Sequence, residues 1–186
     1  MLENVTSIKE LRDVIKCPEL FTSIKELFTQ HPSDKANKKS LINIMFNLNF
    51  NMSHPHDLGK EFLTQLFSMY SNSWEEDKTQ SPIQRKMISI VVVASALEGN
   101  HLNIIDSNFY TQFKRNINDD YATMVAKNEE IELFGLVNIA LNKRLMNKIY
   151  PDLKKIHKIA IKNDKIDFKT KVDMFVEISK YVARLS

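Results

Sequence analysis

The stretch EEIELFGLVNIALNKRLMNKIYPDLKKIHKIAIK, residues 129–162, contains the longest helical pattern in the chain. Its apolar residues recur every three or four positions, the spacing that places side chains on one face of an α-helix. They are Ile131, Phe134, Leu136, Val137, Ala140, Leu141, Leu145 and Ile149, followed by Leu153, Ile156, Ile159 and Ala160. The pattern predicts two core-facing helices. Pro151 would open the second helix, at a first-turn position where its missing N–H costs nothing.

The positions between these apolar residues carry most of the positive charge of the stretch. They hold Lys143, Arg144, Lys148, Lys154, Lys155, Lys158 and Lys162. Lys154, Lys158 and Lys162 are spaced four apart on one predicted helix face, where like charges repel by roughly a few tenths of a kcal/mol per pair. An anion or an acidic partner would offset this repulsion. We therefore predict that these seven residues bind RNA or a protein partner, and a solvated lysine face is the alternative.

Length and composition favour one helical domain. The chain has 186 residues, enough for one well-buried core, and only 3 Gly and 5 Pro. So few glycines argue against the tight hairpins of an all-β fold. We predict a single all-α domain over residues 1–186, with a flexible polar loop near 71–81.

The predicted helices follow one another with mostly short connections. Besides the pair over 129–162, they cover residues 7–16, 18–31, about 33–50, 57–70, 82–99, about 107–121 and 168–184. The last helix has an apolar face of Val172, Phe175, Val176, Ile178, Val182 and Leu185. Nine helices in this order predict antiparallel pairs, as in a bundle or a HEAT-like helical-repeat solenoid.

Charge is distributed unevenly along the chain. The net charge is −4 over residues 1–140 and +7 over residues 141–186. Such asymmetry points to an anionic partner for the C-terminal part. The single cysteine, Cys17, excludes an intrachain disulfide and fits a reducing compartment. The first residues lack a secretion signal, and the longest apolar run, 88–97, is too short to span a bilayer. We predict a cytoplasmic protein, with the nucleus as the alternative, and no membrane partner.

One short motif suggests metal chemistry. His56-Asp57-Leu58-Gly59-Lys60 resembles the metal-binding signature of the HD phosphohydrolase family, whose adjacent His and Asp ligate one divalent ion. The resemblance implies that His31 and His101 would supply further ligands. The preceding Ser53-His54-Pro55 departs from the buried apolar helix that the family places there. We favour the simpler interpretation, in which Asp57 caps a helix and the histidines are exposed loop residues.

The second half of the chain resembles a known repeat family. Its segments, in order, are Ser107-Asn108-Phe109, Phe113-Lys114-Arg115-Asn116, Asp120-Tyr121, Ile131-Glu132-Leu133-Phe134-Gly135-Leu136-Val137 and Lys143-Arg144-Leu145-Met146. Their order and spacing over residues 83–185 are similar to the middle domain of the initiation-factor-4G type, which is built of helical hairpins. The resemblance implies a scaffold that docks a DEAD-box helicase or another translation or mRNA-processing factor, often with RNA contact.

These observations predict a non-enzymatic adapter in mRNA metabolism or translation. It would bind a protein partner, RNA or both through its basic C-terminal helices, with no catalytic residue, metal or cofactor. Two alternatives stay open: a metal-dependent phosphohydrolase centred on His56 and Asp57, and a homo-oligomeric structural or interaction protein.

Overall fold

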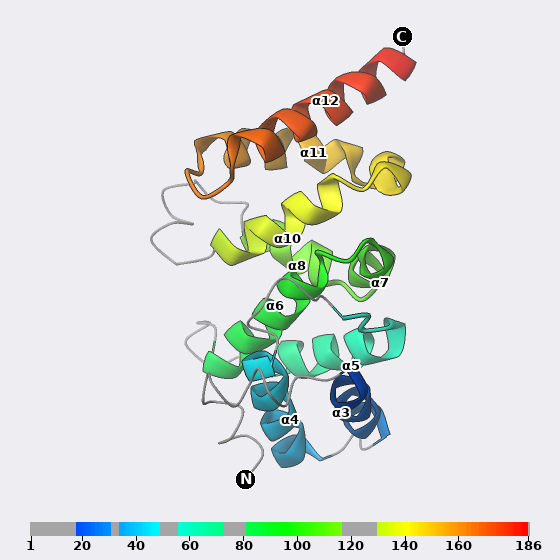
Figure 1. Ribbon diagram of the computed structural model, residues 1–186, viewed down its shortest axis with the longest axis vertical. Coiled ribbons are helices and arrows are strands. Elements are labelled where there is room, and N and C mark those ends of the chain that lie inside the picture. The colour runs from blue at the N-terminus through cyan, green and yellow to red at the C-terminus, as the bar shows by residue number, and fades with distance from the viewer. Residues whose placement is uncertain (1–17, 31–33, 49–55, 73–80, 117–129, 186) are drawn as a thin grey trace. The chain divides into compact units, whose positions relative to one another are not determined.

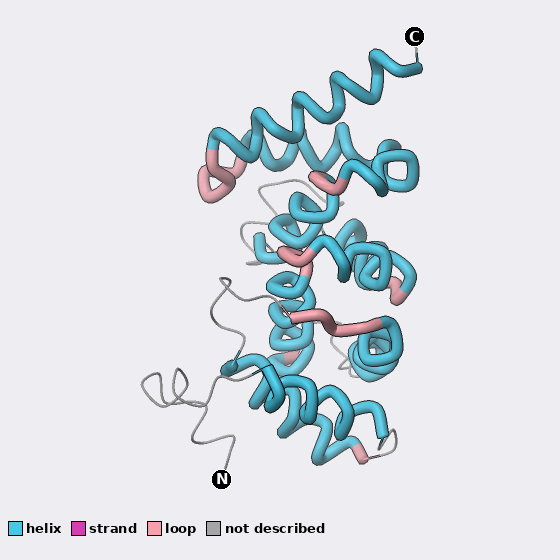
Figure 2. Tube along the Cα trace, turned by 45° about the vertical axis from the view of Figure 1, so that its right-hand side comes forward, coloured by secondary structure: helices cyan, strands magenta, loops and turns pink. Residues whose placement is uncertain are grey.

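The computed structural model describes residues 18–30, 34–48, 56–72, 81–116 and 130–185, and this part of the chain is helical (Figure 2). It holds nine α-helices and two short 3₁₀ segments, with no strand in the described ranges. The predicted all-α fold class is therefore confirmed. The helix predicted over 7–16, Cys17, and most of the polar loop predicted near 71–81 lie outside the described residues.

The chain divides into two compact units, residues 1–109 and 110–186. Each unit has its own set of buried apolar side chains. The prediction of one domain over 1–186 stays a prediction, as does the choice between a bundle and a solenoid. None of the helices within the described ranges combines the length and hydropathy that a bilayer span requires.

Unit 1 is built around helix α4 and helix α6. Its elements are α3 (Pro18–Gln30), α4 (Lys35–Leu48), α5 (Lys60–Ser71), α6 (Pro82–Ala94), η1 (Glu98–Asn100) and α7 (His101–Asp106). Helix α4 packs against both α3 and α6, and α5 packs against α3, α6 and α7 (Figure 1). Packing on two sides buries apolar residues at several positions around α4, namely Ile42, Ile44, Met45 and Leu48.

Helix α6 forms the most apolar part of unit 1, and it begins with a capping box. The Ser81 N–H donates to Oε1 of Gln84 at 2.8 Å, and the Gln84 N–H donates back to the Ser81 hydroxyl at 3.4 Å. Reciprocal bonds of this kind satisfy two N–H groups that have no partner within the helix. The Gln84 side chain also donates to the Tyr70 carbonyl at 2.9 Å and so ties α6 to α5. The helix ends at Ala94, five residues before the predicted boundary at Gly99.

The side chain of Asn100 joins two backbone segments of unit 1, residues 56–58 and the end of α6. Its buried side-chain amide donates to the carbonyls of His56 at 2.8 Å and Ala94 at 2.9 Å. Its Oδ1 accepts from the Leu58 N–H at 3.0 Å. These bonds satisfy backbone groups of residues 56 and 58 and fix the segment before α5 against the end of α6.

Unit 2 consists of helices that pack in chain order. They are α8 (Phe109–Asn116), whose first residue belongs to unit 1, α10 (Glu130–Ala140), η2 (Lys143–Leu145), α11 (Met146–Lys162) and α12 (Phe168–Leu185). Helix α10 packs against α11, and α11 packs against α12 (Figure 1). The Tyr110 hydroxyl donates to Oδ2 of Asp152 at 3.0 Å, and Lys114 forms an ion pair with the same oxygen at 2.9 Å. These two bonds join α8 to α11.

The predicted hairpin over 129–162 has a different boundary. Helix α11 begins at Met146, so Pro151 lies inside the helix and not at its first position. The prediction of Pro151 as a helix start was wrong, because a proline can lie inside a helix where packing offsets the loss of one i→i−4 hydrogen bond. Here the cost is offset by the apolar side chains on both sides of it, since Ile149 and Leu153 are buried.

Two other predicted helix starts also change. Asp57 does not cap α5: its Oδ1 accepts from the Gly59 N–H at 3.0 Å, which makes a turn, and the helix begins after Gly59. Gly59 has φ +71°, a conformation that favours glycine. The helix predicted over 107–121 is preceded by α7 and separated from it by Asn108, which has φ 73°. Residues 117–121 of the predicted helix lie outside the described residues.

Candidate basic interface on helices α11 and α12

Helix α11 separates its apolar and charged residues onto opposite sides. Its buried side chains are Met146, Ile149, Leu153, Ile156, Ile159 and Ala160. Its exposed side chains are Asn147, Lys148, Pro151, Lys154, Lys155, Lys158, Ile161 and Lys162. Five of the seven predicted binding residues therefore share one exposed helix side. Lys148, which precedes the predicted helix start at Pro151, belongs to the same helix because α11 starts earlier than expected.

The single acidic residue of α11 does not balance these lysines. Asp152 is half-buried, and its Oδ2 is engaged by Tyr110 and Lys114 of α8. Burial and the neighbouring Asp152 carboxylate raise the pKa of Tyr110 well above its usual range, so the hydroxyl stays a donor. The only carboxylate of α11 is therefore engaged by α8 and not by the lysines of its own helix.

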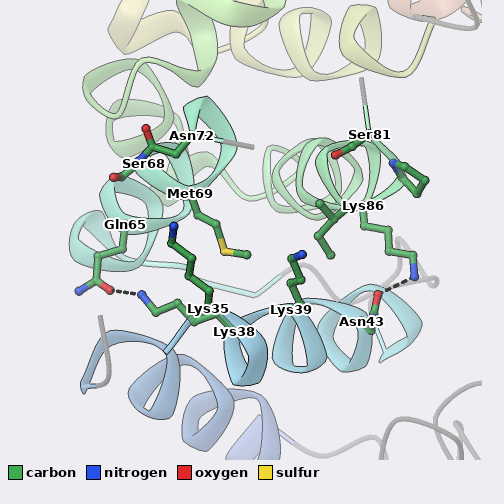
Figure 3. Close-up of a pocket in the computed structure, with 12 residues that line it drawn as sticks. Lys35, Lys38, Lys39, Asn43, Gln65, Ser68, Met69, Asn72, Ser81 and Lys86 are labelled. Atoms are coloured by element: carbon green, nitrogen blue, oxygen red, sulfur yellow. Dashed lines mark hydrogen bonds between the residues drawn. The ribbon is translucent and has the colours of Figure 1, made fainter. Parts of the chain in front are cut away.

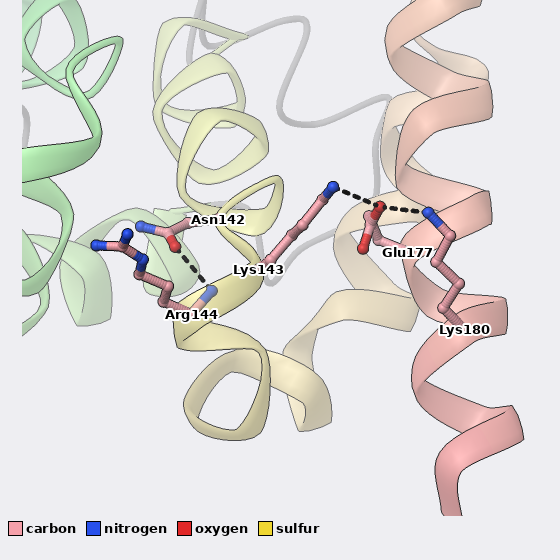
Figure 4. Close-up of polar contacts among 5 residues, drawn as sticks. All are labelled: Asn142, Lys143, Arg144, Glu177 and Lys180. Carbon is pink, nitrogen blue, oxygen red and sulfur yellow. Dashed lines mark hydrogen bonds and ion pairs between the residues drawn. The ribbon is translucent and has the colours of Figure 1, made fainter.

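The remaining two predicted residues, Lys143 and Arg144, lie in η2. Their surroundings differ from those of the exposed lysines of α11. The Lys143 ammonium is 3.7 Å from Oε1 of Glu177 on α12, and Lys180 reaches the same oxygen at 3.1 Å (Figure 4). The Lys143 charge is thus partly balanced within unit 2. The exposed Arg144 follows Asn142, whose Oδ1 accepts the Arg144 N–H at 3.0 Å. This bond starts the 3₁₀ turn that precedes α11.

Helix α12 exposes an apolar face beside this basic row. Phe168 is 80% exposed and Phe175 is 59% exposed. Val172, Val176 and Val182 are exposed as well, whereas Met174 and Ile178 are buried. The apolar face predicted for this helix is therefore divided: Ile178 faces the core, and most of the other members face outward. The arrangement was detectable in the sequence, because apolar residues occupy more of α12 than the one stripe that a single packing partner covers.

One contact shows how the two surfaces adjoin. The rings of His157 on α11 and Phe175 on α12 lie 6.0 Å apart between centroids. Ile161 follows His157 by one turn on the same side of α11 and is 51% exposed. Since each residue turns the helix by about 100°, Lys154 comes next to Ile161 around α11, followed by Lys158 and Lys162. The apolar face of α12 is thus extended by Ile161 and bordered by lysines.

The residues of the HD-like motif have structural contacts in unit 1. The His56 ring stacks on Phe21 with centroids 3.9 Å apart, and Lys25 donates to the Asp57 carbonyl. His101 is buried in α7 with Nε2 2.6 Å from the Ser95 carbonyl oxygen. The predicted exposure of these histidines in loops is wrong for His101 and only partly right for His56, which is half-buried. His31 and His54 lie outside the described residues, among which no group of three His, Cys, Asp or Glu could hold a metal ion.

No protein-family model, curated protein or solved structure matches this chain. The resemblance to the initiation-factor-4G type therefore stays a prediction. The geometry of α11 and α12 is the basis for a functional assignment.

Proposed function

We propose that the protein is a non-enzymatic adapter that binds a protein partner through α11 and α12. The observation that carries the proposal is the apolar face of α12 bordered by the lysine row of α11. Exposed apolar side chains that form one patch mark interaction sites more often than scattered ones do. A patch rimmed by charge of one sign selects the partner by its opposite charge.

The chemistry of the patch specifies the partner. An amphipathic helix with an apolar stripe and acidic flanks would place its stripe on Phe168, Val172, Phe175 and Ile161. Its carboxylates would meet Lys154, Lys158 and Lys162. This is the helix-in-groove mode of recognition, in which apolar anchors give affinity and charges give orientation.

The aliphatic composition favours a protein over RNA. Ile161, Val172, Val176 and Val182 contribute exposed apolar surface but have no π-face on which a base could stack. Phe168 and Phe175 could stack bases, so RNA contact is an outcome that the experiment must separate. The proposed place in mRNA metabolism or translation, with a DEAD-box helicase or translation factor as partner, rests on the family resemblance in residues 83–185.

Co-purification from a native extract tests this function. The chain, its quadruple variant K154Q/K155Q/K158Q/K162Q and the apolar variant F168S/F175S are compared at low and high salt. Bound proteins are identified by mass spectrometry, and nucleic acid is measured by its absorbance ratio. The pair K35Q/K39Q on α4 is the matched control, since it removes two lysines four residues apart in unit 1. Circular dichroism checks that every variant keeps its helicity.

The proposal expects one protein that is recovered with the parent chain and with K35Q/K39Q. Both surface variants should lose it, and an acidic helical segment of that protein should bind alone. Three results contradict the proposal. They are unchanged binding by both variants, recovery of nucleic acid alone with a steep loss at high salt, and a homodimer in light scattering that F168S/F175S dissociates.

A further inference from the structure

A cavity of about 720 Å³ lies within unit 1, between α4, α5 and α6 (Figure 3). Its volume is in the range of sites that hold small molecules. Four lysines line it: Lys35, Lys38 and Lys39 from α4, and Lys86 from α6. No acidic side chain is among the described residues that line the cavity. The cavity is separate from the basic row of unit 2 and does not depend on the adapter role.

The four ammonium groups come from opposite walls. Figure 3 shows Lys35 and Lys39 extending from α4 toward the side chains of α5 and α6. Lys86 extends from α6 toward α4, where its Nζ donates to Oδ1 of Asn43 at 2.5 Å. Lysines on two facing helices can therefore reach a common ligand between them.

Lys38 is the most constrained member of the group. Its residue is only 6% exposed, its Nζ donates to Oε1 of Gln65 at 2.9 Å, and it lies 4.3 Å from the centroid of the Phe28 ring. Both of these partners are neutral, and burial lowers the pKa of the Lys38 ammonium. A charge taken out of water costs free energy unless an opposite charge compensates. An anion in the cavity would supply that compensation.

The spacing of two lysines on α4 adds a second free-energy cost, which a bound anion would remove. Lys35 and Lys39 are four residues apart, an arrangement in which like charges repel. Both side chains are exposed at the cavity, so they can move to a ligand with little rearrangement. Within the described ranges, the lining includes no arginine, which would favour a planar carboxylate through two parallel bonds. Lysine is a mobile point charge and suits the oxygens of a phosphate group.

We propose that this cavity binds a phosphorylated small molecule of nucleotide size. Lys35, Lys39 and Lys86 would contact its phosphates. Met69 and Ile83, which also line the cavity, provide an apolar wall for the body of the molecule. A cavity of this volume is larger than one phosphate requires, and its lining is not uniformly charged, so the ligand includes an apolar or aromatic part.

Calorimetric titration with two probes tests the site. Pyrophosphate carries the phosphate charge alone, and ATP without added metal combines linked phosphates with a base and a ribose. Both are titrated at low salt into the parent chain, K35Q/K39Q and K154Q/K158Q. The two variants remove the same number of lysines at the same helical spacing, one pair at the cavity and one on α11. Circular dichroism again checks the fold.

The proposal expects one ATP per chain, with affinity reduced about tenfold or more in K35Q/K39Q and unchanged in K154Q/K158Q. ATP should bind more tightly than pyrophosphate because of the apolar wall. K86Q should weaken binding from the opposite side of the cavity.

Four results overturn the proposal. They are the absence of binding of both probes, equal weakening by the two double variants, several ATP molecules bound per chain, and equal affinities for the two probes. In addition, binding of single-stranded RNA that requires Lys35 and Lys39 and displaces ATP would assign the cavity to a nucleic acid. Loss of partner binding in the co-purification test leaves this proposal unaffected, because that test depends on α11 and α12.

Discussion

The two units contain the same lysine spacing in different surroundings. Lys35 and Lys39 on α4 face a cavity whose opposite wall carries Lys86. Lys154 and Lys158 on α11 lie on an exposed helix side that adjoins the apolar face of α12. In both proposals the lysine pair contacts an anionic ligand, and the spacing does not indicate the size of that ligand. The surroundings of the pair are the basis for the proposed size, a small molecule for the cavity and a macromolecule for the open face.

The two units also differ in how far their apolar side chains are buried. In α6 the side chains of Met87, Ile88, Ile90 and Val91 are all buried, at 1% exposure or less. In α12 the large side chains of Phe168 and Phe175 are mostly exposed. Helical periodicity is present in both helices, so periodicity alone does not show whether the covering partner belongs to the chain.

The largest expected effect comes from a matched pair of isoleucine truncations. Ile90 on α6 is 0% exposed and Ile161 on α11 is 51% exposed. Ile90→Ala should reduce the free energy of unfolding by about 3 kcal/mol, since it removes buried methyl groups and leaves a cavity. Ile161→Ala should reduce it by about 1 kcal/mol or less, because half of that side chain already contacts water.

Urea denaturation followed by circular dichroism measures both changes. Equal losses in the two variants would show that Ile161 is covered in solution and would weaken the case for an open face on unit 2.

A smaller effect is expected in unit 2 at alkaline pH. Burial and Asp152 raise the folded-state pKa of Tyr110 above its unfolded value near 10. Above that pH the unfolded chain loses the phenolic proton and the folded chain keeps it, so stability should fall as the pH rises above about 10. Tyr110→Phe removes the hydrogen bond to Asp152, so it should lower stability at neutral pH, and it removes the ionisation, so it should flatten the alkaline decline. Urea midpoints between about pH 8 and 11 provide the measurement, and parallel curves for both proteins would refute the assignment.

The smallest effect is expected in unit 1 at mildly acidic pH. Burial lowers the pKa of His101, while the Ser95 carbonyl and Glu98 oppose the shift. Below the unfolded value near 6.5 the unfolded chain binds a proton that the folded chain does not, so stability should fall as the pH decreases through that value. His101→Gln should lose this slope between about pH 7 and 5. If the slope persists in His101→Gln, another group is responsible. The two units would then lose stability in different pH ranges, unit 1 at mildly acidic pH and unit 2 at alkaline pH.

Local sequence patterns predicted much of the fold. The start of α3 at Pro18, the apolar character of α6 and the extent of α12 all follow from proline position and helical periodicity. Helix boundaries were less predictable. Pro151 lies inside α11 and Asp57 makes a turn before Gly59, because packing and backbone conformation override the local preference for a helix start.

The candidate site was also predicted only in part. The lysine row Lys154, Lys158 and Lys162 was identified from sequence because a helix places residues four apart on one side. The contact of Lys143 with Glu177, the exposure of Phe168 and the cavity lined by Lys35 and Lys86 were not identified. Each depends on two segments that are distant in the sequence.

The sequence by itself determined the helical class, the amphipathic character of α11 and the excess of positive charge in the last quarter of the chain. These properties are local, since they depend on residue spacing within one helix and on composition. Only the tertiary structure decided which apolar faces are covered and which lysines converge. Burial and convergence depend on the packing of separate helices, and the same helical pattern is compatible with a buried face in α6 and an exposed one in α12.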